Sequence, residues 1–236
     1  MFWQELWQAF LLYAGFIVAG LALVLLLQAI LKTPDYIFRK LLHTLAYASV
    51  VPLLFGAEHW YVAAAIKALL ILPILLILWY CERFELYPKF FMEKEKHEVV
   101  CSFVLLFAML ATLICVFWGG FGERGKALVL ASVLAWGPGD AAAAIVGRNW
   151  GKHKLSGPHI EGTKSVEGCV AMGLCAFIFS LGVLLLMGKL PFWPVLGVSL
   201  LTAAVSALTE LYTKRGLDTV TVPIAAGLCL SLTLLL

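Results

Sequence analysis

The sequence predicts an all-α fold, a polytopic bundle of about eight membrane-spanning helices, with seven as the alternative count. Composition is the first observation, because 63% of the 236 residues are hydrophobic and only 13% are charged, unlike an ordinary soluble domain. Length is the second, because several apolar runs reach the roughly 20 residues that a helix needs to cross a bilayer. We expect one integral membrane domain over residues 1–236.

Polar linkers separate the apolar runs. Pro34 is expected to stop any helix in the first linker. Lys67, inside the third run, is expected to snorkel toward the membrane surface. The charged segment 81–98 is typical of an amphipathic interfacial helix, and the six cysteines are expected to be small hydrophobes without disulfides. The expected spans are residues 8–31, 41–56, 60–81, 99–118, 127–147, 168–188, 191–212 and 219–236.

The distribution of cations orients these spans. Thirteen of the 17 lysines and arginines fall in linkers on one side of the predicted topology. Because cytoplasmic loops carry the excess of Lys and Arg, that side is expected to be cytoplasmic, with both termini on the opposite side. The net charge of +3 is small, and no basic stripe or tail points to nucleic acid.

A carboxylate and a cationic loop stand together after the fifth run. Asp140 lies inside the run, where a charged side chain costs about 2.5–3.5 kcal/mol on insertion scales. Pro138 can break or kink the run and free backbone groups. The loop 148–167 then supplies the small and cationic residues that a phosphate needs. This pattern predicts a site where a metal-bound nucleotide meets a molecule held in the membrane; the alternative for Asp140 is a structural ion pair with Arg148.

Other polar residues fall at the same predicted membrane face. His43 stands near the start of the second run, after the cations Arg39 and Lys40. Glu210 ends the seventh run, and Asp218 begins the eighth. A single active site open to cytosolic nucleotide requires such a shared face, although acids at helix ends are often only solvated.

The segment 157–165 nearly spells a Walker A motif. Thr163 separates Gly162 from Lys164, and no strand precedes the segment, so a P-loop fold is excluded. Lys164 and Ser165 are still expected to contact phosphate and metal. The alternative is a solvated, positively charged cytoplasmic loop.

The order of these motifs resembles the dolichol kinase and phytol kinase family, which includes CTP-dependent diacylglycerol kinases. The resemblance spans about residues 39–223, with one departure, since Thr219 follows Asp218 where the family often has Asn. The motifs are Arg39-Lys40-Leu41-Leu42-His43, Gly139-Asp140-Ala141, Gly147-Arg148, Gly151-Lys152, Lys164-Ser165-Val166-Glu167-Gly168, Glu210 and Leu217-Asp218-Thr219-Val220-Thr221-Val222-Pro223.

The resemblance implies a membrane enzyme that transfers the γ-phosphate of a nucleoside triphosphate, typically CTP, to a lipid alcohol such as a polyprenol, a phytol-like alcohol or diacylglycerol. Mg²⁺ is the expected cofactor. The expected catalytic residues are Asp140, Lys164 and His43. The expected phosphate-binding residues are Arg39, Lys40, Arg148, Gly151, Lys152, Lys164, Ser165 and Gly168. The expected metal ligands are Asp140, Glu167, Glu210 and Asp218.

Two alternatives remain open. A CTP-dependent cytidylyltransferase making a CDP-lipid would share the membrane, nucleotide and metal, but its Lys-Asp and Pro-Gly-His-Gly-Gly signature is not visible. A transporter would place a broken helix at Pro138 beside Asp140 in mid-membrane. It would also require internal repeats, and the sequence contains none that stand out.

Overall fold

The computed structural model describes residues 2–83, 96–158, 160, 164–188, 190–214 and 216–235. Within these ranges every element is helical, and only two isolated β-bridges occur, Lys154–Ser165 and Gly157–Ile160. Eight spans in the described ranges are long and apolar enough to cross a membrane. The predicted all-α fold and helix count are confirmed, and the chain is an integral membrane protein.

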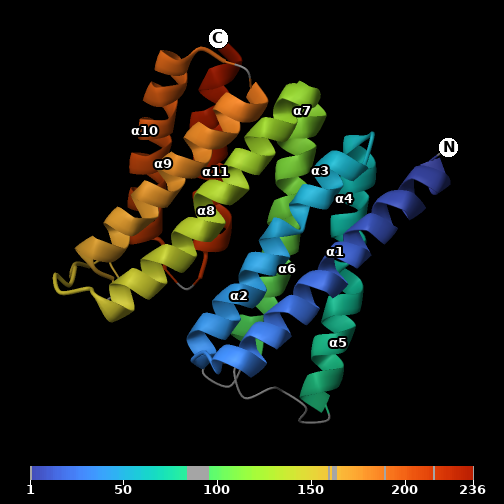
Figure 1. Cartoon of the computed structure of the whole chain (residues 1–236), viewed down its shortest axis with the longest axis horizontal. Helices are drawn as coiled ribbons and strands as arrows, with labels where there is room; N and C mark the ends of the chain where they lie inside the picture. The colour runs from blue at the N-terminus through green and yellow to red at the C-terminus, as the bar shows by residue number, and fades with distance from the viewer. Residues whose placement is uncertain are drawn as a thin grey trace. The chain divides into compact units, whose positions relative to one another are not determined.

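The chain divides into two compact units, Met1–Cys115 and Val116–Leu236. The prediction of a single domain is not tested by this division and stays a prediction. Unit 1 contains α1 (Phe2–Leu31), α2 (Asp35–Ala48), α3 (Val50–Gly56), α4 (Trp60–Leu69), α5 (Ile71–Arg83) and α6 (Lys96–Leu113). Unit 2 contains α7 (Gly119–Phe121), α8 (Glu123–Asn149), α9 (Val166–Gly188), α10 (Phe192–Tyr212), α11 (Asp218–Leu230) and a 3-10 turn, Ser231–Leu235 (Figure 1). A π-helical turn, Ile114–Trp118, spans the boundary between the two units.

Local chemistry explains the helix ends in unit 1. Pro34 is the N-cap residue of α2, so the predicted stop after the first span is confirmed. Ser49 joins α2 to α3, and its hydroxyl donates a hydrogen bond to the carbonyl of Ala46 at 2.6 Å. Residues 84–95 of the predicted interfacial helix lie outside the described residues.

Lys67 lies in the interior of unit 1, and its predicted snorkelling is wrong. Its side chain is 0% exposed. The Nζ atom donates a hydrogen bond to Oγ of Ser49 at 2.6 Å and lies 4.8 Å from the ring centroid of Tyr13 and 5.2 Å from that of Phe107. A hydroxyl and two ring faces therefore surround the amino group inside the bundle.

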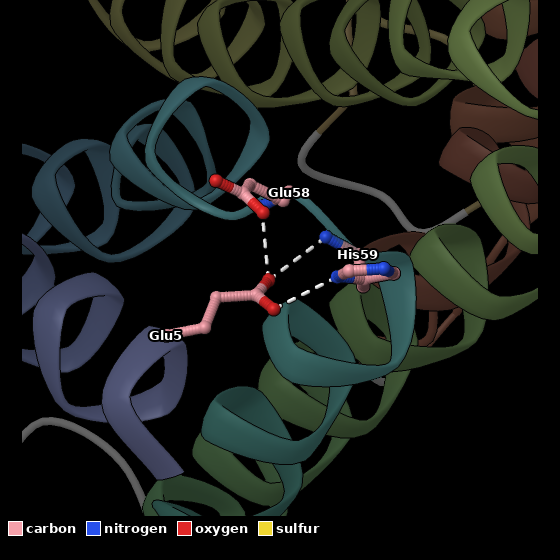
Figure 2. Close-up of side chains that lie close together, drawn as sticks. All are labelled: Glu5, Glu58 and His59. Atoms are coloured by element: carbon pink, nitrogen blue, oxygen red, sulfur yellow. Dashed lines mark hydrogen bonds and ion pairs between the residues drawn. The ribbon is translucent and has the colours of Figure 1, made fainter. Parts of the chain in front are cut away.

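Glu5 joins the start of α1 to the start of α4. Its Oε1 atom accepts hydrogen bonds from the backbone N–H groups of Glu58 and His59, both at 2.9 Å, and Oε2 lies 2.8 Å from Nδ1 of His59 (Figure 2). The three side chains are close enough to share a cation. The hydrogen bonds alone account for the position of Glu5, because a carboxylate satisfies the free N–H groups at a helix N-terminus.

Four alanines mark one level inside unit 2. Ala135 of α8, Ala176 of α9 and Ala226 of α11 are fully buried and pack together, with Ala203 of α10 against them. We call these four residues the alanine layer. Small side chains at one level allow helices in a membrane to approach closely.

The helix α8 is continuous through Pro138, so the run is not broken there and the transporter alternative loses its broken helix. Proline removes only its own N–H donor, and neighbouring groups can compensate within a packed transmembrane helix. The predicted absence of disulfides holds among the described cysteines, which are free thiols: Cys115, Cys169, Cys175 and Cys229.

Gly125 gives a test of the packing at the start of α8. A Cβ atom there would lie 1.9 Å from the carbonyl oxygen of Phe117 and 2.7 Å from Cα of Trp118, both rigid backbone atoms. We expect Gly125→Ala to lower the unfolding free energy by about 1–3 kcal/mol through overpacking, measured by thermal unfolding in detergent. Gly182→Ala is the matched control, because its Cβ would meet nothing within 4 Å. Equal melting temperatures for the two variants would contradict this packing.

Candidate functional site

The predicted acids of unit 2 lie at one end of its bundle. Because a helix rises 1.5 Å per residue, Asp140 lies about 8 Å beyond the alanine layer along α8. By the same rule Glu210 lies about 10 Å beyond it along α10, and Asp218 about 12 Å beyond it along α11. The loop from α8 to α9 and the turn from α10 to α11 lie at this same end, which we call the loop end (Figure 1).

The described part of the α8–α9 loop folds back on itself. The N–H of Leu155 donates to the carbonyl of Lys164 at 3.0 Å, and the N–H of Val166 donates to that of His153 at 3.0 Å. These bonds form a short antiparallel pairing at the entry to α9. The predicted catalytic loop therefore has a fixed base on the bundle.

Gly151 allows this loop to approach α9. A Cβ atom there would lie 2.2 Å from the carbonyl oxygen of Gly147 and 2.6 Å from Oγ of Ser165. Ser165 is buried, and its hydroxyl accepts a hydrogen bond from the N–H of Gly168 at 3.2 Å, so it caps the N-terminus of α9. Its predicted contact with phosphate stays a prediction.

Lys164 and Glu210 form an ion pair. Nζ of Lys164 lies 2.7 Å from Oε1 of Glu210, and the two side chains are only 15% and 12% exposed. The same ammonium group donates to the backbone carbonyl of Glu210, near the last turn of α10. The predicted phosphate-binding lysine is therefore held against one of the predicted metal ligands.

Glu167 is paired with His153 at the loop end. Its Oε1 lies 2.7 Å from Nδ1 of His153, and the carboxylate also accepts from the backbone N–H of His153 at 3.2 Å. The Glu167 side chain keeps 26% of its surface exposed. His153 was not predicted as a site residue, and its spacing from the acid gave no signal because the loop brings them together.

Two further lysines bind backbone carbonyls at the loop end. Lys154 donates to the carbonyl of Gly147 at 3.3 Å, in the last turn of α8, and Lys214 donates to that of Pro158 at 2.9 Å. A cation at a helix C-terminus satisfies a free carbonyl and complements the helix dipole, as Lys154 does on α8. The carbonyl of Pro158 belongs to the loop between α8 and α9. Only the general enrichment of Lys near helix ends could have indicated these roles from sequence.

The remaining predicted residues divide between the units. Arg148 and Lys152 are exposed at the loop end, whereas Asp140 and Asp218 are half-buried. The other predicted residues lie on α2 of unit 1, where Arg39, Lys40 and His43 are half-buried and the His43 ring meets the Phe103 ring edge-on at 6.1 Å. The predicted site residues of unit 2 thus lie at the loop end, whereas those of α2 lie within unit 1.

The chain matches a known protein family over most of its length. The model of the cytidylyltransferase family matches residues 1–215. The chain belongs to the cytidylyltransferase family. It is also similar to a phytol kinase of Synechocystis sp., at 35% identity over 115 residues, covering 47% of this chain and 46% of that protein. No solved structure matches.

This relationship confirms the predicted family, because the relative is one of the phytol kinases. The matched stretch spans about half the length of that relative. Family membership alone does not fix the reaction, because the family model and the phytol kinase bear the names of different activities.

Gly151→Ala tests the close contact between the loop and α9. The added methyl overlaps the carbonyl of Gly147 and the hydroxyl of Ser165, so we expect the loop to detach. Hydrogen exchange of the Leu155 and Val166 amides should accelerate about tenfold or more, as local opening becomes easier. Gly157→Ala is the control, since its Cβ meets only side-chain atoms of Ile160, Cδ1 at 3.5 Å and Cγ1 at 3.8 Å, at ordinary van der Waals distances. Unchanged exchange in Gly151→Ala would show that the loop does not depend on this contact.

Proposed function

We propose that the protein is a membrane lipid-alcohol kinase that transfers the γ-phosphate of a nucleoside triphosphate, with CTP as the expected donor. The observation that carries the proposal is the gathering of half-buried Asp140 and Asp218 with exposed Arg148 and Lys152 at one end of a membrane-embedded bundle. Phosphoryl transfer requires mainly positioning and charge neutralisation. The similarity to a phytol kinase supports a lipid alcohol as acceptor.

The donor set fits Mg²⁺, which prefers carboxylate oxygens and keeps several of its waters. Asp140 and Asp218 would hold the ion, with Glu167 as a further carboxylate at the start of α9. When bound, the ion would neutralise negative charge on the β- and γ-phosphate oxygens. Arg148 and Lys152 bind the remaining phosphate oxygens, and the glycines of the loop allow the backbone to approach them.

The acceptor hydroxyl meets the nucleotide at the loop end. An exposed apolar stripe runs away from that end along α9, with one residue on each turn, at Val166, Val170, Leu174 and Ile178. A prenyl or acyl tail lies against such a surface within the hydrocarbon, which leaves its hydroxyl at the membrane surface. The candidate base for that hydroxyl is Asp140, and a role for His43 with Arg39 and Lys40 stays a prediction.

The loop end faces the cytoplasm in this proposal. The excess of Lys and Arg in the linkers on that side supports the orientation, and cytosolic nucleotide then reaches the site directly. Both termini lie on the opposite side of the membrane.

Cytidylyl transfer is the second candidate, because the matching family model bears that name. The two reactions cleave different bonds of CTP. A kinase moves the γ-phosphate to the hydroxyl and releases CDP. A cytidylyltransferase moves the cytidylyl group to a lipid phosphate and releases pyrophosphate.

One labelling experiment distinguishes the candidates. Purified protein in detergent is incubated with Mg²⁺, CTP labelled at either the α or the γ position, and phytol, geranylgeraniol, a long polyprenol, diacylglycerol or phosphatidate. We expect the γ label, and not the α label, in an extractable lipid formed from an alcohol. The α label in lipid, with phosphatidate as acceptor, would support the cytidylyltransferase. ATP labelled at the γ position tests the choice of donor.

Asp140→Asn tests the proposed metal ligand. The substitution keeps the size of the side chain and removes its charge, so we expect the rate of phosphate transfer to fall about a hundredfold or more, while the protein stays folded in the membrane. Glu123→Gln is the matched control, because Glu123 is an exposed acid at the start of α8, at the other end of that helix. Full activity of Asp140→Asn would exclude this role.

A further inference from the structure

Lys164 is anchored by Glu210 in two ways. Its ammonium group donates to Oε1 of the Glu210 side chain at 2.7 Å and also to the backbone carbonyl of the same residue. One turn deeper, the thiol of Cys169 contacts the carbonyl of Ala207 at 3.7 Å. The entry to α9 is thus tied to the last turns of α10, and the side chain of Lys164 has a defined direction.

We propose that Glu210 is a positioning residue that aims Lys164 at the nucleotide phosphates, and that it is not a metal ligand. This inference rests on the proposed function. A lysine ammonium group has three N–H donors, and Glu210 takes two of them. The third donor is left for a phosphate oxygen, and the 15% exposure of the side chain leaves it accessible.

The charge balance of the ion pair also favours a positioning role for Glu210. The carboxylate of Glu210 is only 12% exposed and is already neutralised by Lys164. A carboxylate that a lysine already neutralises and that is largely buried gains less from binding Mg²⁺, which favours the positioning role for Glu210. Fixing Lys164 before the nucleotide arrives also reduces the side-chain ordering that binding requires.

Kinetics of four variants test the proposal. We expect Lys164→Met and Glu210→Ala each to raise the KM for the nucleotide about 10- to 100-fold, the range for a charge-assisted hydrogen bond. The double variant should be no worse than Lys164→Met, since both substitutions remove one interaction. Glu210→Gln keeps an oxygen acceptor and should restore most of the activity. The Mg²⁺ concentration at half-maximal rate should not change in Glu210→Ala; an increase, with additive losses in the double variant, would overturn the proposal.

Amine acylation gives a readout that does not need kinase activity. We expect acetic anhydride to modify Lys164 faster in Glu210→Ala than in the natural protein, as followed by mass spectrometry. Lys126 is the internal control, because it pairs with Glu123 at 3.0 Å at the start of α8. Unchanged acylation of Lys164 would overturn the anchoring. Faster acylation without transfer of phosphate to any lipid would instead contradict the kinase and leave the anchoring intact.

Discussion

The close approach of α9 to α8 is the constraint on which the loop end depends. Gly147, Gly151 and Gly168 leave no space for a side chain beside Ser165, because an added Cβ at any of them would come within 3.3 Å of its hydroxyl oxygen. Helices in a membrane gain little from hydrophobic association and rely on such close packing. The chain must therefore leave α8 and enter α9 within a narrow space, and the paired loop between them follows from that geometry.

Several lysines of the loop end bind backbone carbonyls of the packed helices and loop. Lys154, Lys164 and Lys214 each donate to a backbone carbonyl at the loop end. Unsatisfied carbonyls are costly near the hydrocarbon, so these lysines stabilise the fold where the helices end. The positive charge of the loop end is therefore only partly available to a phosphate. Arg148 and Lys152, which are exposed, carry the part that faces solvent.

Patterns that lie along the chain could be predicted, and contacts between distant segments could not. Hydrophobic length and charge asymmetry predict the spans, and Pro34 marks a helix start. Sequence gave no indication that Lys67 points inward, because a long aliphatic stem in a membrane helix suits either direction and the deciding contacts come from other helices. The pairing of Lys164 with Glu210 joins residues 46 positions apart, so only the folded bundle reveals it.

Lys67 and Lys164 differ in how far their surroundings leave the side chain accessible. Lys67 is 0% exposed, and a hydroxyl and two aromatic rings surround its amino group. A triphosphate has no route to such a group without unfolding part of the bundle. Lys164 keeps 15% of its side-chain surface exposed, and a carboxylate and a carbonyl hold it from one side. Because an anion can approach only the second, the proposed phosphate transfer is expected at the loop end, where an oriented lysine lies among acids that the membrane would otherwise exclude.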